Sequence, residues 1–188
     1  IAHGYAAGLL ALAVAGFLYG LGSFVFVWAL KWLLVGRYRA RAAPMWTPFV
    51  WLSEAVTSLY EAIVVPNWLN YLRGTPLLPF FLRLMGSRIG RGVFMDTTDI
   101  TEFDCVEIGD RVELNNLAGP QTHLFEDRIM KIGPVRIGHG VTVRARGTIL
   151  YDARIGDEAC LGPLTLVMKG ETIPPASAWS GSPAAPSR

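Results

Sequence analysis

The residue best placed for chemistry is a histidine inside an irregular stretch of the chain. His123 lies in the run QTHLFEDR at residues 121–128. An imidazole titrates near neutral pH and can take a proton from a nucleophile when a hydrogen bond fixes its tautomer. We therefore expect His123 to act as a general base. The neighbours expected to shape this loop, with the acidic pair holding the imidazole, are Thr122, Glu126, Asp127 and Arg128.

The remaining histidines are placed less favourably. His3 precedes a long apolar stretch, and His139 lies in a regular repeat where its side chain should face solvent. A zinc site of three histidines would therefore lack ligands, so we expect no metal.

Four carboxylates lie close together upstream of the histidine. They are Asp96, Asp99, Glu102 and Asp104. Like charges at this density repel one another unless water or a cation balances them. Two interpretations remain open: a solvated acidic edge, or a pocket that attracts and orients an ammonium-bearing substrate.

A repeat of six residues predicts the element that positions these groups. Aliphatic side chains recur at every sixth position, at Ile137, Val143, Ile149, Ile155, Leu161, Val167 and Ile173. A chain that turns a corner at this interval closes a triangular coil and stacks one aliphatic side chain per face on the next coil. The period is typical of a hexapeptide parallel β-helix, which winds left-handed in families that carry the motif. We assign residues 87–188 to this mainly β domain.

The period fails once. After an in-phase block at residues 89–114 it is lost between residues 115 and 134, and it resumes at Ile137. A long insertion in a regular solenoid is expected to leave the coil as a loop, and such loops commonly carry function. The predicted excursion loop 115–134 contains His123.

A transmembrane helix is predicted at the start of the chain. Residues 5–30 carry no formal charge, a run longer than the roughly 20 residues that cross a bilayer as a helix. Four basic residues follow it: Lys31, Arg37, Arg39 and Arg41. The positive-inside rule then places the downstream β-helix in the cytoplasm. No basic region precedes the run, which argues against a signal peptide. Residues 1–43 form this unit, and the missing initiator methionine suggests a piece of a longer protein.

Residues 44–86 combine aromatic side chains with prolines and scattered charges. Proline interrupts helices, and Trp and Tyr favour the membrane–water interface. We expect short amphipathic helices at the membrane surface, while a helical cap over the open end of the coil remains an equal alternative. The net charge of +2, without a basic stripe, argues against a nucleic-acid partner.

Several blocks stand in the order found in one family. They are residues 31–39 (KWLLVGRYR), 77–86 (LLPFFLRLMG), 96–104 (DTTDITEFD), 121–128, 168–171 (MKGE) and 179–184 (WSGSPA). On these blocks the chain resembles the terminal region of polylysine-synthetase-type non-ribosomal peptide synthetases. These are a membrane-bound branch of the hexapeptide-repeat acyltransferases.

The resemblance implies an activity and its partners. Adenylation and carrier domains upstream in the same polypeptide would make an aminoacyl thioester on 4′-phosphopantetheine. Membrane-linked domains like this one would then join the acyl group to the amine of a free basic amino acid. Tandem homologous copies would form a pseudo-trimer in the cell membrane, as parts of a multi-pass protein.

The resemblance also suggests roles for individual residues. His123 would be the catalytic base. The four carboxylates at positions 96, 99, 102 and 104 would be candidates for binding the cationic acceptor. Trp179 and Ser180 would border the pantetheine channel. Two alternatives stay open: a CoA-dependent acetyltransferase of an amine-bearing small molecule, and a catalytically silent scaffold copy.

Overall fold

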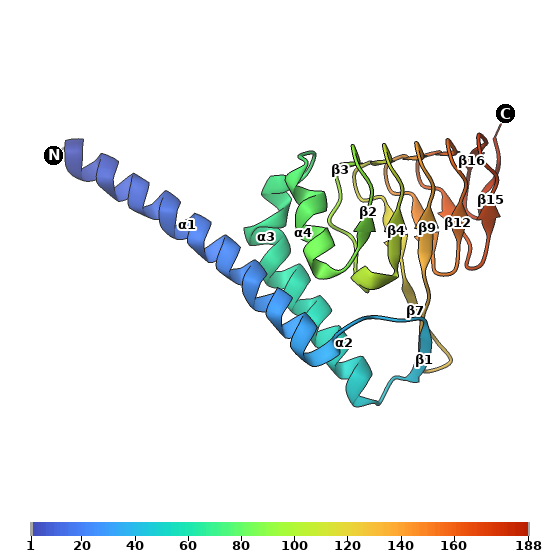
Figure 1. Ribbon diagram of the computed structural model, residues 1–188, viewed down its shortest axis with the longest axis horizontal. Coiled ribbons are helices and arrows are strands. Elements are labelled where there is room, and N and C mark those ends of the chain that lie inside the picture. Colours follow the sequence, from blue (N-terminus) through green and yellow to red (C-terminus); the bar gives the residue numbers. More distant parts are fainter. Residues whose placement is uncertain (1, 188) are drawn as a thin grey trace.

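A long helix projects from one end of the molecule (Figure 1). The structure, a computed structural model, describes the backbone of residues 2–187. Helix α1 (Ala2–Leu30) continues into a π-helical turn at Lys31–Val35. Every residue from Tyr5 to Tyr19 is exposed, whereas Phe24, Val27 and Lys31 are buried against the helices that follow. The first half of α1 therefore stands away from the rest of the chain.

The region after α1 is helical but less fragmented than expected. Its elements are α2 (Pro48–Leu59), a π-helical turn (Tyr60–Val64), α3 (Val65–Asn67), a 3-10 turn (Leu69–Leu72) and α4 (Leu77–Met85). The first three form one uninterrupted helix of 20 residues, Pro48–Asn67. Pro48 takes the first helical position, where its missing N–H costs no hydrogen bond. The expectation that the prolines cut this region into short helices is therefore wrong for Pro48–Asn67, whereas the residues after it do form a short 3-10 turn and the nine-residue helix α4.

Two helices are long and apolar enough to cross a membrane, namely Tyr5–Val35 and Pro48–Asn67. The first matches the predicted apolar run. The second had been expected to lie at the membrane surface because no charge-free run in it reaches spanning length.

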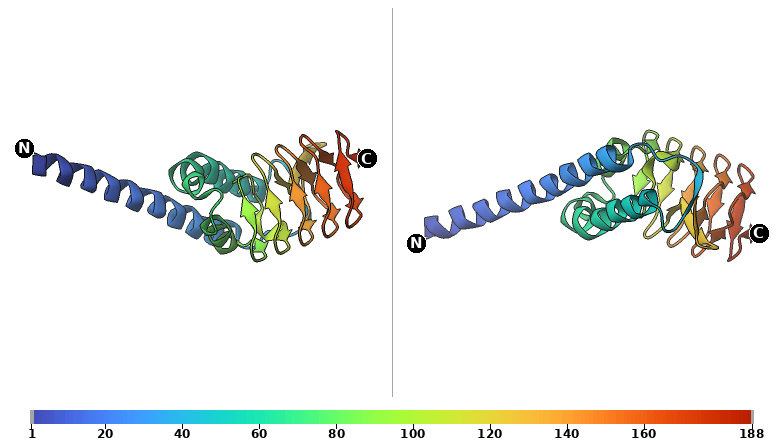
Figure 2. Two further views of the ribbon diagram at one scale, coloured as in Figure 1. Left: turned by 90° about the horizontal axis from the view of Figure 1, so that it is seen from above. Right: turned by 90° about the horizontal axis from the view of Figure 1, so that it is seen from below.

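The rest of the chain winds through three sheets of parallel strands (Figures 1 and 2). Strands pair with the strand one coil further on: Thr142 lies opposite Cys160, and Thr148 opposite Leu166, 18 residues later in each case. Three hexapeptides thus make one coil, as the period predicts. The coil strands are β2 (Arg88–Ile89), β3 (Phe94–Met95), β4 (Val106–Ile108), β5 (Glu113–Leu114), β6 (Gly119–Gln121), β9 (Val135–Ile137), β10 (Thr142–Val143), β11 (Thr148–Leu150), β12 (Arg154–Ile155), β13 (Cys160–Leu161), β14 (Leu166–Val167), β15 (Thr172–Ile173) and β16 (Ala178–Ser180), with β17 (Ala185–Pro186) antiparallel to β16.

The aliphatic series forms the interior of the coil. All seven side chains from Ile137 to Ile173 are at most 3% exposed. Burial of each contributes roughly 1.5 to 3 kcal/mol to folding. Helices α2 to α4 gather at the N-terminal end of the coil (Figure 2), and Leu78 and Leu82 of α4 are fully buried there.

The insertion is narrower and more regular than predicted. Of the expected loop 115–134, β6 still belongs to the coil and pairs with β11. Only the following residues leave it, as a hairpin of β7 (His123–Glu126) and β8 (Ile129–Ile132). Strand β1 (Arg41–Pro44) extends the hairpin into a three-stranded antiparallel sheet. The chain after α1 thus reaches across to the inserted hairpin.

Candidate functional site

The hairpin places His123 at a corner of the coil. The two residues of its turn, Asp127 and Arg128, both have positive φ, as a tight two-residue hairpin requires. The backbone N–H of Met45 donates to the Arg128 carbonyl at 3.0 Å, and Ile132 lies between Arg41 and His123 in the sheet. Strand β8 therefore pairs along both of its edges, with β7 and with β1, which ties the hairpin to the chain after α1.

His123 is hydrogen-bonded to a carboxylate from the preceding coil. Its Nδ1 lies 2.9 Å from Oε2 of Glu102. The Glu102 side chain is fully buried, and that of His123 is 13% exposed. A buried carboxylate facing Nδ1 favours the tautomer with the proton on Nδ1, which leaves Nε2 as the proton acceptor.

Glu102 Oε2 also accepts hydrogen bonds from two hydroxyl groups. Thr101 Oγ1 donates to Glu102 Oε2 at 2.8 Å, and Thr122 Oγ1 donates to it at 2.6 Å. Glu102 itself precedes a short 3-10 turn, Phe103–Cys105, that leads into β4. The three donors fix one rotamer of the carboxylate and hence the direction of the imidazole.

Electrostatics favour the charged forms of both partners. Burial acts against the imidazolium, but the hydrogen bond to Glu102 and the charge of that carboxylate outweigh it and raise the pKa of His123. Burial likewise acts against the carboxylate, but its bonds from His123, Thr122 and Thr101 lower the pKa of Glu102. The pair therefore combines a basic imidazole with an ionised partner, as general base catalysis needs.

The expected partners of His123 contact other groups. Glu126 accepts hydrogen bonds from Lys131, at 2.8 Å, and from Lys169 of the coil. The hydrogen bond from Lys131, which has the larger effect, and that from Lys169 together lower the pKa of Glu126 to about 2. Asp127 lies exposed at the hairpin turn. The prediction that Glu126 and Asp127 hold the imidazole is therefore wrong.

The four upstream carboxylates do not act together. Asp96 accepts a bond from Arg73 Nε at 2.9 Å, Glu102 holds His123, and Asp104 pairs with Lys31. Of these four, only Asp99 is exposed and makes no ion pair with any residue that the structure describes. A single acidic pocket of all four is therefore wrong, because three of them are paired with basic side chains on different elements.

Asp104 joins the end of α1 to the coil. Its Oδ2 accepts a bond from Lys31 Nζ at 2.6 Å and another from the backbone N–H of Tyr38 at 3.1 Å. The Lys31 side chain is fully buried, so it is no part of an open basic flank. Gly86, with φ 123°, ends α4 beside this carboxylate, and a Cβ there would lie 2.6 Å from Asp104 Oδ1. The end of α1, the 3-10 turn Phe103–Cys105 and the end of α4 thus meet at Asp104, two residues from Glu102.

Two further carboxylates whose charges act on His123, those of Glu54 and Glu61, were not predicted. Glu54 of α2 has a buried Oε1 without a hydrogen-bond partner among the described residues, and Glu102 Oε1 is in the same state. The charges of Glu54 and Glu61 both raise the pKa of His123. No sequence signal marked either residue, since they lie on a helix some 60 positions away from the hairpin.

The residues assigned to a pantetheine channel lie at the far end of the coil. Trp179 is partly buried against the core, and its Nε1 donates to Ser177 Oγ at 3.0 Å. Ser180 is exposed and pairs with Ala185. The contacts of Trp179 are those of a packing residue, and its role toward pantetheine stays a prediction.

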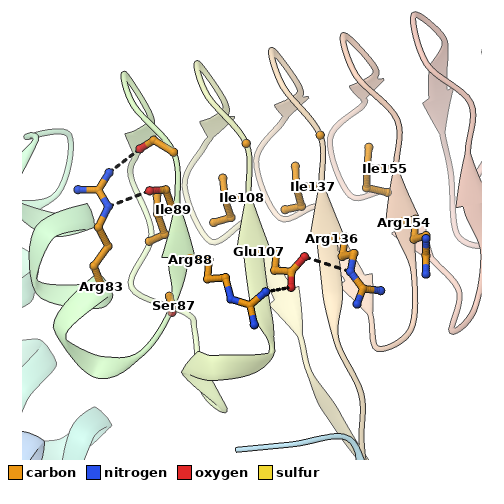
Figure 3. A pocket seen from close by; sticks show the side chains of 13 residues that line it. Arg83, Ser87, Arg88, Ile89, Glu107, Ile108, Arg136, Ile137, Arg154 and Ile155 are labelled. Atoms are coloured by element: carbon orange, nitrogen blue, oxygen red, sulfur yellow. Dashed lines mark hydrogen bonds and ion pairs between the residues drawn. The ribbon is translucent and has the colours of Figure 1, made fainter. Parts of the chain in front are cut away.

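An arginine-lined cleft of about 720 Å3 runs along the sheet formed by β2, β4, β9 and β12 (Figure 3). Outward positions on successive strands carry Arg88, Glu107, Arg136 and Arg154, and Glu107 bridges the first two arginines. Arg83 lies at one end and donates to the carbonyls of Ile89 and Gly90. Guanidinium groups in such a row suit phosphate or another anion.

The arrangement of His123 and Glu102 supports proton transfer by the imidazole. Among the described residues no three His, Cys, Asp or Glu side chains are grouped to hold an ion. His123 Nε2 is the group left to accept a proton at a corner flanked by carboxylates. Carboxylates attract an ammonium-bearing molecule to this corner, and its amine becomes a nucleophile once it has lost a proton.

The chain thus combines a coil of hexapeptide repeats with a histidine on an inserted hairpin. The chain is 67% identical over 179 residues to the Delta-poly-L-ornithine synthetase of Acinetobacter baumannii (strain AB307-0294). The match covers 95% of this chain and 13% of that synthetase. The resemblance to poly(amino acid) synthetases predicted from the sequence is thereby confirmed.

Solved structures with similar coils are more distant. A hexapeptide-repeat acetyltransferase from Vibrio cholerae is 19% identical, with 55% of this chain and 62% of that one covered at a TM-score of 0.47. A maltose O-acetyltransferase from Clostridium difficile 630 is 23% identical, with coverages of 64% and 81% and a TM-score of 0.49. No protein-family model matches the sequence.

Proposed function

We propose that this chain forms amide bonds as one domain of a membrane-bound poly(amino acid) synthetase. The acyl group comes from a thioester on the phosphopantetheine arm of a carrier domain, and the acceptor is the amine of a free diamino acid such as ornithine. The observation that carries the proposal is the buried Glu102–His123 pair at 2.9 Å, in a chain 67% identical to part of a polyornithine synthetase.

The chemistry assigned to His123 follows from its hydrogen bond. Glu102 holds the proton on Nδ1, so Nε2 accepts the proton of the attacking amine as the new C–N bond forms. The C–S bond of the thioester breaks, and the same proton passes to the departing thiolate. Glu102 stays ionised throughout and stabilises the imidazolium between the two transfers.

The donor would be held by its phosphate. Pantetheine supplies the acyl group as a thioester at one end and carries a phosphodiester at the other. Arg136 lies on β9, the coil strand that follows the hairpin, and Arg154 lies on the neighbouring strand β12; both line the cleft, so we assign the phosphodiester to it. CoA carries the same phosphate chemistry, which makes it the alternative donor.

The setting follows from the apolar helices. We propose that α1 anchors the domain in the cell membrane as part of a multi-pass protein, with the helix Pro48–Asn67 at the membrane surface and the coil on the cytoplasmic side. The coil is taken to be a left-handed parallel β-helix, as the motif implies. Adenylation and carrier domains would lie upstream in the same polypeptide, and homologous tandem domains would complete a pseudo-trimer around the site.

A donor-swap assay tests this function. Membranes holding the full-length synthetase would receive a radiolabelled diamino acid with ATP, or acetyl-CoA and the amino acid without ATP. The proposal predicts labelled oligomers only when the carrier is loaded, and no acetylated product from acetyl-CoA. Acetylation from CoA without a loaded carrier would establish the alternative activity instead.

A further inference from the structure

The structure contains a small charged cavity directly beside the Glu102–His123 pair. It has a volume of about 160 Å3 and lies between the helix Pro48–Asn67 and the segment that leads to Glu102. This volume is below the roughly 300 to 1,000 Å3 of sites for drug-sized ligands and suits a molecule of amino-acid size.

One wall of the cavity touches the catalytic pair. Thr101 lines the cavity, and its Oγ1 lies 2.8 Å from Glu102 Oε2 and 3.5 Å from Thr122 Oγ1. A molecule in the cavity is therefore separated from the carboxylate that orients His123 by a single side chain. The cavity and the reaction corner are neighbours in space.

The floor of the cavity is rigid. Tyr60 lines it and is 1% exposed, and its hydroxyl donates to the Thr98 carbonyl at 2.9 Å. Its ring packs edge-on against Phe103 with centroids 5.1 Å apart. These contacts tie the helix to the segment 97–101 and hold the cavity open at a fixed width.

Three ionised groups face this space from different elements. Glu61 comes from the helix, Asp99 from the coil segment, and Arg73 from the chain between the 3-10 turn and α4. Arg73 Nε donates to Asp96 at 2.9 Å, and its terminal nitrogens make no hydrogen bond to any residue in the described part of the chain. A guanidinium oriented in this way presents the two-pronged donor that matches a carboxylate.

The set of charges matches one class of ligand. At its α-carbon a free diamino acid carries a carboxylate beside an ammonium group, and the cavity offers a guanidinium for the first and two carboxylates for the second. An ammonium held by carboxylates stays protonated and cannot attack an acyl group. The amine that reacts must therefore be the other one, at the end that reaches the histidine.

We propose that Arg73, Asp99 and Glu61 bind the α-carboxylate and α-ammonium of the free diamino acid acceptor, so that its side-chain amine is presented to His123. This inference rests on the proposed function and names the acceptor pocket and the reacting amine. In this proposal Asp99 is the one member of the upstream acidic set with the acceptor-binding role predicted from the sequence.

Acceptor discrimination tests the pocket. Full-length synthetase in membranes would be assayed with a loaded carrier and either L-ornithine or 1,4-diaminobutane, which has the same two amines without the carboxylate. The wild type should prefer ornithine in kcat/KM. Arg73→Gln should reduce that preference roughly 10- to 100-fold by weakening only the carboxylate-bearing acceptor. Asp99→Asn should raise KM for ornithine with a smaller effect on kcat.

Control variants separate binding from structural damage. Asp96→Asn weakens the bond that orients Arg73 from outside the cavity lining, and it should reduce the preference for ornithine less than Arg73→Gln does. Arg146→Gln and Glu158→Gln change exposed charges on the coil and should leave the preference unchanged. An unchanged preference in Arg73→Gln, or products joined through the α-amine, would overturn the pocket assignment while leaving the proposed function intact. A wild type that makes no amide from a loaded carrier would overturn both.

Discussion

His123 and Glu102 are 21 positions apart in the chain, yet Nδ1 and Oε2 lie 2.9 Å apart in a site that is nearly closed to solvent. The relationship exists because successive coils place residue 102 and the root of the hairpin at the same corner. It converts a histidine on an inserted hairpin into an oriented base. Most of the consequences that can be measured follow from this contact.

Replacing the carboxylate should change both rate and pH dependence. In Glu102→Gln the imidazole loses the charge that raises its pKa above 6.5 while its burial remains, so the pKa of His123 should fall. The acid limb of kcat/KM should shift to lower pH, and kcat should drop by about 100-fold or more because the tautomer is no longer fixed. An acid limb in the same place as in the wild type would show that Glu102 does not set the basicity of His123.

The Glu102–His123 contact also predicts how stability changes with pH. The raised pKa of His123 means that its contribution is complete below the unfolded value and is lost as pH rises through the folded pKa. The lowered pKa of Glu102 means the opposite, with loss as pH falls through its folded value. Protection of the hairpin from hydrogen exchange should therefore be greatest in the window between those two folded-state pKa values, and Glu102→Gln should flatten this dependence.

The buried pair Lys31–Asp104 should support the segment that carries Glu102. Lys31→Met leaves Asp104 without its cation in a protected site, a loss of about 3 to 5 kcal/mol for comparable buried pairs. Hydrogen exchange in residues 98–105 of the full-length protein should accelerate. The double variant Lys31→Met with Asp104→Leu should recover much of the protection, because an apolar pair can replace a buried ion pair. Unchanged exchange in the single variant would contradict this role.

The ion pairs of Glu126 with Lys131 and Lys169 should hold the hairpin against the coil. Glu126→Gln weakens the contacts with Lys131 and Lys169, so residues 123–132 should exchange faster and kcat should fall severalfold. Asp127→Asn at the exposed turn is the matched control and should change neither. Because the pKa of Glu126 is about 2, the wild-type links should persist through mildly acidic pH and fail only as pH falls toward that value.

The arginine cleft should bind the phosphate of the acyl donor. Arg136→Gln combined with Arg154→Gln should raise the KM for the loaded carrier with little effect on the KM for the amino acid. Trp179→Ala probes the other proposed position of the pantetheine arm. If only the Trp179 variant raises the donor KM, the phosphate does not lie in the arginine cleft.

The repeat and the insertion could be predicted from the sequence because each depends on the spacing of aliphatic residues close together in the chain. The aliphatic residues from Ile137 to Ile173 are buried as their period requires, and His123 was marked by the place where that period fails. A six-residue repeat reports directly on packing, so it predicted the core without any knowledge of long-range contacts.

The partners of these residues could not be read in the same way. Glu102 stood among four similar carboxylates, and only the register between coils decides which of them meets the imidazole. Lys31 matched a cytoplasmic basic flank, but it is buried because Asp104 and the end of α4 converge on it. The pairing of β1 with the hairpin joins segments some 90 positions apart, and neither strand carries a pattern that identifies the other.

The central claim is that His123 catalyses amide formation in this domain. The direct measurement is the yield of oligomer from a loaded carrier in full-length synthetase carrying His123→Ala, compared with His139→Ala, which removes an exposed histidine from the coil. We predict that His123→Ala lowers the rate by about 100- to 10,000-fold while the carrier still loads, and that His139→Ala stays close to the wild type. Oligomer formation at the wild-type rate in His123→Ala would contradict the account and make this domain a scaffold.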